Sequence, residues 1–349
     1  VPLRHRPSLD GRRGIHRKMK ALVYTGPETQ AYRDVADPTP SASDALIKVA
    51  HTGICGSDMH AFLGHDERRP APLILGHEVA GTVVSGPLEG KRVTVNPLVT
   101  CGTCAACRSG RDNLCPERQI ISMPPREGGF ADYLAMPEGN LVVVPDNITD
   151  SQAALAEPIA CGWHAVRLAK RALISDPSEA KALVIGGGAI GLGAALSLKA
   201  QGITQVRLIE PNAERAQFLK SSCGIEVLTP DQAETSGQYD LIVDGVGYAA
   251  TRATATKLAK PGGVISHIGL GSSDGGLDIR RMTLQEITFI GTYTYTAEDF
   301  HETTKAMFDG RLGVLDWTEI RPLSDGLRAF TDLRQGAVAV PKILLTPDN

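Results

Sequence analysis

The sequence predicts a two-domain α/β protein in which a small β-rich unit precedes a doubly wound parallel sheet. Its 349 residues are enough for about two domains, each with its own core. Short strand patterns broken by Gly and Pro run from Met19 to about Val144. From Lys181 onward, near-continuous apolar runs alternate with helical patterns, as expected for parallel strands that are buried on both faces.

The N-terminal residues 1–18 are rich in arginine and have no helical or strand periodicity. Proline and glycine within them also disfavour the amphipathic helix of a transit peptide. We therefore expect a disordered extension upstream of a start at Met19. Strand patterns then follow at residues 19–25, 45–54, 76–84, 91–98, 131–137 and 140–145. Their spacing predicts a small β-barrel-like unit.

The second half of the chain carries the parallel-sheet signal. Its apolar runs lie at residues 181–186, 205–210, 239–246, 262–269 and 286–293. The tail then predicts a helix at 297–312, a strand at 318–323, a helix at 325–336 and a strand at 341–346. These last strands have no βαβ partner in the parallel run, so we assign them to the first domain.

The composition limits the kinds of partner that the protein is expected to bind. A net charge of −3 and a pI near 6.3 argue against nucleic acid or an anionic membrane as the main partner. No apolar run reaches the roughly 18 residues needed to span a bilayer. We expect a soluble cytoplasmic protein that acts on a small molecule.

Four cysteines, Cys101, Cys104, Cys107 and Cys115, lie within fifteen residues in the stretch CGTCAACRSGRDNLC. Thiolates at this spacing can bind one tetrahedral Zn²⁺ from a single loop. Such a structural site has no open position for substrate, so a catalytic metal must lie elsewhere.

The same four cysteines could instead form disulfides, bind an iron–sulfur cluster or remain free thiols. A disulfide framework is disfavoured by the chain length and by the odd number of cysteines, seven. An iron–sulfur cluster shares the C-x2-C-x2-C start and the final Cys-Pro, but its last gap is three residues, whereas here it is seven. Free thiols stay as an open alternative to zinc.

A glycine-rich turn predicts a dinucleotide site. Gly186, Gly188 and Gly191 form G-x-G-x-x-G between a strand and a helix, where glycines let a pyrophosphate approach the backbone. Glu210 ends the next strand, and a carboxylate there accepts the ribose hydroxyls and repels a 2′-phosphate. NAD is therefore favoured over NADP. Arg215 either flanks the adenosine or pairs with Glu214 on a solvated helix.

Cys55, His77, Glu78 and Glu157 are candidate catalytic zinc ligands. A thiolate, an imidazole and a carboxylate with one open position are the catalytic pattern. Each residue could also have a purely structural role: Cys55 as a small buried side chain, His77 as a core histidine and Glu157 as a helix N-terminal charge. The sequence alone does not show that they converge.

The motifs together resemble the zinc-dependent medium-chain alcohol dehydrogenases, in the branch of sorbitol, other polyol and threonine dehydrogenases. The resemblance rests on C-G-x-D-x-H at 55–60, GHEVAG at 76–81, the four-cysteine lobe, the Glu-Pro at 157–158 and the late GGGAIG, and it extends from Met19 to the C-terminus. It implies a GroES-like catalytic domain with a structural-zinc lobe at 19–162 plus 298–349, and a Rossmann NAD-binding domain at 163–297.

The resemblance also implies roles for individual residues. Cys55 and His77 bind the catalytic zinc, with Glu157 as the expected third ligand and Glu78 close enough to exchange with it. Asp58 orients the ligating histidine, and Ser57 and His60 relay the proton to solvent. Further candidate cofactor contacts are Ile190, Val246, Gly269 and Leu270.

The function implied is oxidation of a secondary alcohol by NAD⁺, with a polyol or sugar alcohol as the favoured substrate. Alternatives are a sugar-phosphate, hydroxy-acid or amino-alcohol dehydrogenase of the same family, or a catalytically silent NAD-binding sensor. Arg68 and Arg69 could meet a phosphate or acid, but we interpret them as solvated surface. The family implies a homodimer or homotetramer, joined through the sheet edge near ITFIGTY.

Overall fold

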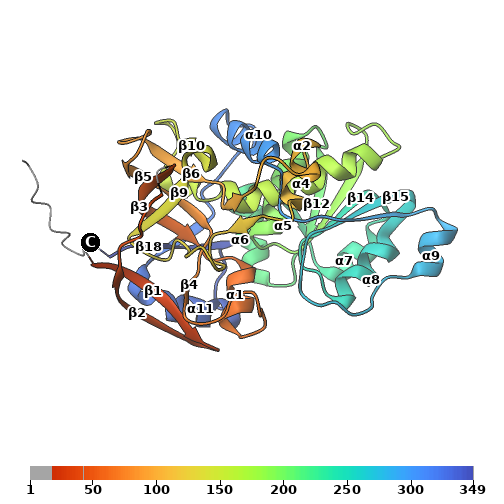
Figure 1. The fold of residues 1–349 in the computed structure, drawn as a ribbon. Helices are drawn as coiled ribbons and strands as arrows, with labels where there is room; N and C mark the ends of the chain where they lie inside the picture. Colours follow the sequence, from red (N-terminus) through yellow and green to blue (C-terminus); the bar gives the residue numbers. More distant parts are fainter. Residues whose placement is uncertain (1–17, 42, 349) are drawn as a thin grey trace, which may run out of the picture.

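The computed structural model describes residues 18–41 and 43–348. A β-rich unit and a parallel sheet with its helices lie side by side (Figure 1). The chain passes from the β-rich unit to the parallel sheet and then returns, because its last strands join the first unit. The architecture confirms the predicted fold class.

The β-rich unit contains a three-stranded sheet in the order β2-β1-β4 and a larger sheet in the order β10-β6-β5-β3-β18-β17, with β9 also paired to β3. Strands β7 and β8 form a separate ribbon. The bounds are β1 Lys18–Gly26, β2 Thr29–Ala36, β3 Asp44–Gly53, β4 Leu73–Ile74, β5 Glu78–Ser85, β6 Arg92–Val95, β7 Leu98–Val99, β8 Gln119–Ile120, β9 Tyr133–Pro137, β10 Leu141–Val143, β17 Thr318–Pro322 and β18 Lys342–Thr346.

The C-terminal strands complete this unit. Strand β18 pairs antiparallel with β3 through Leu344 and Gly53, and β17 pairs parallel with β18. On its other side, β3 pairs with β5, so that Gly53 lies opposite Glu78. This register brings the end of β3 and the start of β5 together beside β18.

The second unit is a six-stranded parallel sheet in the order β13-β12-β11-β14-β15-β16. Alternate residues of its central strand β11 face opposite cores: Ala182 and Val184 pack into one hydrophobic cluster, and Leu183 and Ile185 into another. Burial on both faces explains the continuous apolar runs. The bounds are β11 Lys181–Ile185, β12 Gln205–Ile209, β13 Glu226–Leu228, β14 Tyr239–Asp244, β15 Ala259–His267 and β16 Thr288–Gly291.

The helices connect and cover these sheets. They are α1 Gly56–Phe62, α2 Ala105–Arg108, α3 Asp150–Ala153, α4 Ala156–Ala172, α5 Ala189–Ala200, α6 Ala213–Cys223, α7 Pro230–Thr235, α8 Ala249–Leu258, α9 Ile279–Leu284, α10 Ala297–Phe308 and α11 Gly326–Arg334, with 3₁₀ turns η1 Asp112–Leu114, η2 Glu138–Asn140 and η3 Leu323–Asp325. Within the described ranges, no helix is both long and apolar enough to cross a bilayer.

Some elements differ from the sequence-based expectations. Strand β2 was not predicted because its residues are mostly polar and half-exposed, so they show no apolar alternation. Strand β13 was missed because it has only three residues. The predicted disordered extension lies outside the described residues, except for Lys18, which begins β1.

Candidate active site

Three candidate ligands meet where β3, β5 and α1 come together. One ligand atom each from Cys55, His77 and Glu78 lies within 4.8 Å of the others. Cys55 precedes helix α1, and Glu78 begins β5 opposite Gly53. A Cβ atom at Gly53 would lie 1.8 Å from Oε2 of Glu78, so a side chain here would displace the Glu78 carboxylate. The sheet register therefore assembles the cluster.

His77 is held by groups on its protein side. Its Nδ1 lies 3.4 Å from Oδ1 of Asp58 and 3.4 Å from the Ser122 hydroxyl. Asp58 is fully buried and accepts hydrogen bonds from the backbone N–H groups of Cys55 at 3.0 Å and Gly76 at 3.2 Å. Asp58 therefore orients the imidazole and also ties the two ligand-bearing loops together.

The surroundings of His77 favour a cation. Burial lowers the pKa of His77, but the negative charges of Asp58 and Cys55 outweigh this and raise that pKa well above its ordinary value. A cluster that stabilises positive charge at its centre suits a divalent metal ion as well as a proton.

Glu78 is held on one oxygen only. Lys342 in β18 donates from Nζ to Oε1 of Glu78 at 2.6 Å and to the carbonyl of Ile54 at 2.8 Å. Oε2 of Glu78 is buried without a hydrogen-bond partner. A buried, unpartnered carboxylate oxygen beside a thiol and an imidazole fits a zinc ligand set.

Glu157 lies in the first turn of α4, next to this cluster but outside the three-ligand group. It is buried and accepts a hydrogen bond of 2.9 Å from the hydroxyl of Tyr295. Burial raises the pKa of Glu157 to about 7, and the charges of His77, Glu78 and Lys342 also act on it. The structure thus groups Glu78, rather than the expected Glu157, with Cys55 and His77. Which carboxylate binds metal stays a prediction.

The expected proton relay lies on helix α1. Ser57 and His60 are three residues apart, which places them on one face of the helix, and both are half-buried. The His60 ring centroid is 6.5 Å from that of His65. The relay itself stays a prediction.

The interpretation of Arg69 as solvated surface was wrong. Its side chain is 1% exposed and donates to the carbonyls of Ser122 and Ser57 and to Asp66. Arg68 does reach solvent, with its side chain 61% exposed and paired to Asp66. Arg69 therefore holds the loop around the site, because its guanidinium bonds to two carbonyl groups and one carboxylate.

The four cysteines form the second metal-competent group. Sγ of Cys101 lies 3.9 Å from that of Cys107 and 3.5 Å from that of Cys115, and Cys104 and Cys107 are 3.5 Å apart. None of the four is in a disulfide. Tetrahedral Zn–S bonds of about 2.3 Å place sulfurs about 3.8 Å apart, so these spacings fit structural zinc.

The glycine-rich turn lies at the carboxyl end of β11, where parallel sheets bind dinucleotides. Gly186 has a φ of +98°, which favours glycine, and Gly188 caps helix α5. A Cβ atom at Gly191 would lie 1.8 Å from the Gly186 carbonyl oxygen. Gly186 and Gly191 therefore each have a local structural reason to be glycine, whereas an added Cβ at Gly188 would meet nothing within 4 Å.

Glu210 and Arg215 lie close together beyond this turn. Glu210 is 6% exposed and accepts hydrogen bonds from the backbone N–H of Gly187 at 2.9 Å and of Asn212 at 2.8 Å. Arg215 donates to the carbonyl of Val338 at 2.7 Å and lies 4.0 Å from Glu210. Arg215 thus joins the parallel-sheet unit to the C-terminal segment, and the alternative in which it pairs with Glu214 on a solvated helix was wrong.

The remaining cofactor candidates lie near the carboxyl ends of the parallel strands. A Cβ atom at Gly186 would touch Val246, and the N–H of Gly269 bonds to the carbonyl of Asp244 at 3.1 Å. Leu270 is 72% exposed, and Ile190 lies in the first turn of α5. All four surround the carboxyl ends of β11, β14 and β15.

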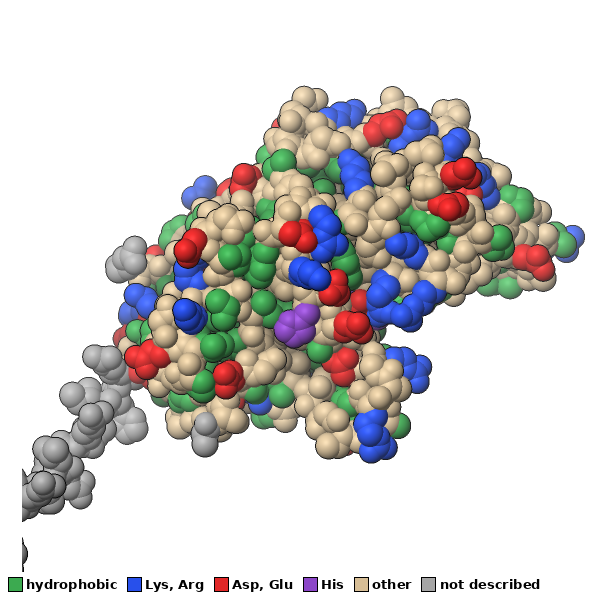
Figure 2. Space-filling model, turned by 90° about the horizontal axis from the view of Figure 1, so that it is seen from above, with side chains coloured by type: hydrophobic (Ala, Val, Ile, Leu, Met, Phe, Trp, Pro, Cys, Tyr) green, Lys and Arg blue, Asp and Glu red, His purple; other side chains and the backbone are tan. Residues whose placement is uncertain are grey.

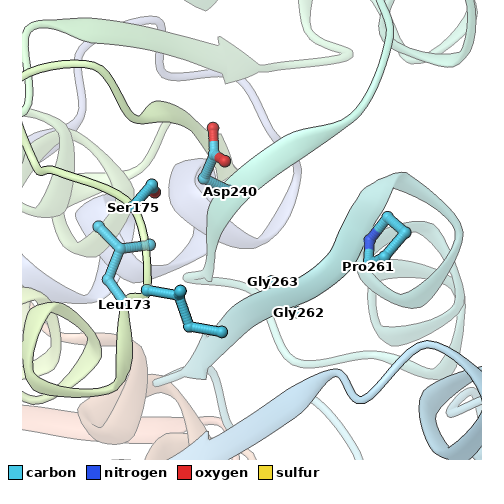
Figure 3. A pocket seen from close by; sticks show the side chains of 7 residues that line it. Leu173, Ser175, Asp240, Pro261, Gly262 and Gly263 are labelled. Atoms are coloured by element: carbon cyan, nitrogen blue, oxygen red, sulfur yellow. The ribbon is translucent and has the colours of Figure 1, made fainter.

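A separate hollow of about 220 Å³ lies near the amino ends of β14 and β15, at the end of the sheet opposite the glycine-rich turn (Figure 3). Asp240 near the start of β14 and residues Pro261 to Gly263 of β15 line it, together with Leu173, Ile174 and Ser175. Since dinucleotides bind at the carboxyl ends of the strands, this hollow is not the predicted cofactor site.

On the face in Figure 2, acidic and basic side chains are intermixed.

Two residues of the site were missed in the sequence. Lys342 is a lysine within an otherwise apolar strand, and that mismatch was the available signal. Tyr295 follows β16 and does not belong to any of the sequence motifs described above. Both contact candidate ligands through their polar ends.

Comparisons with known proteins match a family model to each of the two units. Residues 41–146 match the alcohol dehydrogenase GroES-like domain, and residues 189–309 match the zinc-binding dehydrogenase family. The chain is 32% identical over 309 residues to the L-galactonate-5-dehydrogenase of Escherichia coli K12, covering 84% of this chain and 88% of that protein. It is 28% identical over 344 residues to a probable D-xylulose reductase A of Arthroderma otae, covering 91% and 95%.

A solved structure shows the same fold with its cofactor. An alcohol dehydrogenase from Escherichia coli CFT073, complexed with NADH, superposes with a TM-score of 0.85 at 25% identity, covering 94% of this chain and 99% of that one.

Proposed function

Because this chain belongs to the zinc-type medium-chain alcohol dehydrogenases, in their polyol and sugar-acid branch, we propose that it oxidises a secondary alcohol group of a polyol or sugar alcohol with NAD⁺. The products are the ketone, NADH and a proton. The observation that carries the proposal is the group of half-buried Cys55 with buried His77 and Glu78, in which one carboxylate oxygen has no partner.

The residues present fit a catalytic zinc. Cys55 and His77 would hold it together with Glu78 or Glu157, and the four cysteines would hold a structural zinc. The catalytic ion would supply Lewis-acid stabilisation of the negative charge that develops on the alcohol oxygen.

The chain's own side chains then prepare the reaction. Asp58 keeps the His77 ring in one orientation, and Lys342 keeps Glu78 in place through Oε1 while Oε2 has no hydrogen-bond partner. Ser57 and His60, which are both half-buried in α1, would carry the alcohol proton toward solvent.

Glu210 supports NAD as the cofactor. Its carboxylate lies beside the glycine-rich turn, where it would accept ribose hydroxyl groups and disfavour a 2′-phosphate. Arg215 is occupied by the carbonyl groups of Val338 and Ala339, which reduces its availability to a phosphate.

A sugar acid is the second candidate substrate, since the E. coli relative is named an L-galactonate-5-dehydrogenase. We also propose a homodimer or homotetramer. Strand β16 is an edge strand, and Leu270, Ile279 and Leu284 expose apolar side chains on the same unit.

The test is formation of NADH or NADPH with a panel of polyols, sugar acids, amino alcohols and sugar phosphates, each with NAD⁺ and with NADP⁺. We expect the highest kcat/KM for a polyol with NAD⁺. A preference for sugar acids would select the second candidate. NAD⁺ binding without turnover of any substrate would favour a silent sensor and contradict both.

A further inference from the structure

The segment between Tyr293 and Ala297 is fastened to the four-cysteine lobe at both ends. Asn113 Nδ2 donates to the carbonyl of Tyr293 at 2.8 Å. The N–H of Ala297 donates to the carboxylate of Asp112, with 3.0 Å to Oδ2. Both lobe residues lie in the turn η1, which immediately precedes Cys115. The lobe therefore sets where this segment runs.

A third contact supports the same attachment. The guanidinium of Arg118 lies 5.0 Å from the centre of the Tyr293 ring, a cation–π distance. The Asn113 side chain is buried, and its hydrogen bond to the Tyr293 carbonyl is partly buried. The attachment thus combines a partly buried hydrogen bond, a carboxylate contact and an aromatic contact.

The middle of the segment reaches the candidate active site. Tyr295 is 1% exposed, and its ring packs against Phe300 with centroids 5.6 Å apart. Its hydroxyl donates to Oε1 of Glu157 at 2.9 Å. A phenol fixed by packing at its ring and by a hydrogen bond at its tip leaves the carboxylate little freedom.

The backbone between the attachments is strained. Thr294 has a φ of 45°, in the left-handed region that β-branched residues rarely adopt. Such a conformation persists only where the surroundings impose it. Tyr293 and Tyr295 on either side are held by the lobe and by Glu157, which accounts for it.

We propose that the four-cysteine lobe positions the Glu157 carboxylate, with Tyr295 as the positioning residue that makes the final contact. The lobe then shapes the catalytic centre as well as its own loop. Disturbing the lobe is therefore expected to alter how the Cys55 site holds its metal. The proposal rests on the proposed function, because it takes the Cys55 group to be a zinc site.

The experiment measures the rate at which the chromogenic chelator 4-(2-pyridylazo)resorcinol removes zinc from the full-length protein. The kinetic phase that is missing in Cys55→Ala is assigned to the catalytic site. Tyr295→Phe removes one hydroxyl and keeps the ring, and Asn113→Ala removes one amide. These two variants and their double variant are compared with the parent.

Asn147→Ala is the matched control. Asn147 also donates its side-chain amide to a backbone carbonyl, that of Phe308, but it has no link to Glu157. Asp112→Ala replaces Asn113→Ala if thermal unfolding shows that the latter does not fold.

Each single variant is expected to speed the Cys55-dependent phase by about three- to tenfold, the effect of one lost hydrogen bond. The double variant is expected to be no faster than the faster single variant, because both act through one path. Asn147→Ala should leave the phase unchanged. The kcat of Tyr295→Phe is expected to fall more than its KM rises.

Three results would overturn the proposal, and they differ in scope. Effects of the two single variants that multiply in the double variant, or an unchanged rate in Asn113→Ala, contradict the coupling while leaving the metal site intact. The absence of any Cys55-dependent phase contradicts the metal site, and with it the proposed function and the coupling.

Discussion

Lys342 and Glu78 form an almost fully buried ion pair, with Nζ 2.6 Å from Oε1 and side chains that are 3% and 0% exposed. The pair joins the C-terminal strand β18 to the first residue of β5. Its lysine also donates to the carbonyl of Ile54, next to Cys55. A residue at the end of the chain therefore supports two ligand-bearing segments near its beginning.

Replacing Lys342 with Met is expected to destabilise the protein by about 3–5 kcal/mol, because the Glu78 carboxylate stays buried without its partner. Urea unfolding of the zinc-loaded protein measures the change. Lys20→Met is the control, since Lys20 pairs with Asp34 at 2.8 Å where both side chains are about half exposed. Because that pair lies in solvent, it is expected to contribute little to stability. Equal effects of the two substitutions would contradict the role of Lys342.

Adding a methyl group at Gly53 is expected to displace Glu78, since the new Cβ would lie 1.8 Å from Oε2. Gly53→Ala should therefore lose zinc from the Cys55 site and lose most of its activity, which metal analysis and NADH formation measure together. Gly56→Ala is a close control, because nothing lies within 4 Å of its added Cβ. In helix α1 it should be neutral or stabilising by up to about 1 kcal/mol. Full zinc content in Gly53→Ala would argue against Glu78 as a ligand.

The sequence predicted the parts of this site that local patterns encode. Cys55, His77 and the four cysteines lie in short motifs, and most of the parallel strands lie in apolar runs of six to eight residues, so each could be recognised from its neighbours. The ligand group also depends on the β3–β5 register, which places Gly53 opposite Glu78. That register is a pairing between two separate strands, so no local sequence pattern encodes it.

The residues that were missed act across long stretches of chain. Lys342 is 264 residues from Glu78, and Tyr295 is 138 residues from Glu157. Neither contact leaves a periodic pattern. Arg69 was misread because a buried arginine and a solvated one look alike in sequence. Its burial is explained by the carbonyl groups of Ser57 and Ser122 and by the carboxylate of Asp66.

Metal content should separate the two cysteine groups. We expect two zinc ions per chain, one for each group of candidate ligands. Cys55→Ala should retain one zinc and a folded lobe, whereas Cys104→Ala should lose the other zinc and lower the unfolding temperature. Elemental analysis with thermal unfolding measures both. Cys223→Ala is the control, because Cys223 is half-buried in α6 and belongs to neither group. If the parent contained only one zinc per chain and Cys55→Ala left that content unchanged, the basis for the catalytic site would be removed.

Asp299 should make the protein more stable near neutral pH than in acid. Burial raises the pKa of Asp299, but hydrogen bonds from His164, Arg167 and Thr296 outweigh it and hold that pKa well below its usual range. A lowered pKa contributes stability above the unfolded value of about 3.9, and this contribution is lost as the pH falls below it. Asp299→Asn should therefore cost about 1.5–3 kcal/mol at pH 7 and less as the pH falls from about 5 to 3.

The measurement is the difference in unfolding free energy between the parent and Asp299→Asn across that range of pH. Asp309→Asn is the matched control, since Asp309 pairs with Arg311 at 2.8 Å but both side chains are 42% exposed. We expect little effect from it at any pH. A difference for Asp299→Asn that stays constant with pH would show that its carboxylate is not the source of the stability.

Glu210 should control cofactor affinity more than turnover. In Glu210→Gln one side-chain oxygen becomes an NH₂ group, so either the N–H of Gly187 or that of Asn212 loses its acceptor. The ribose would also lose a charged acceptor, a loss of about 1.5–3 kcal/mol. We expect the KM for NAD⁺ to rise by roughly ten- to a hundredfold with a much smaller change in kcat, together with a smaller preference for NAD⁺ over NADP⁺. Glu226→Gln, on the edge strand β13 with an exposed partner in Arg207, should leave both constants unchanged. An unchanged KM in Glu210→Gln would mean that the carboxylate supports only the turn, and the preference for NAD⁺ would then need another source.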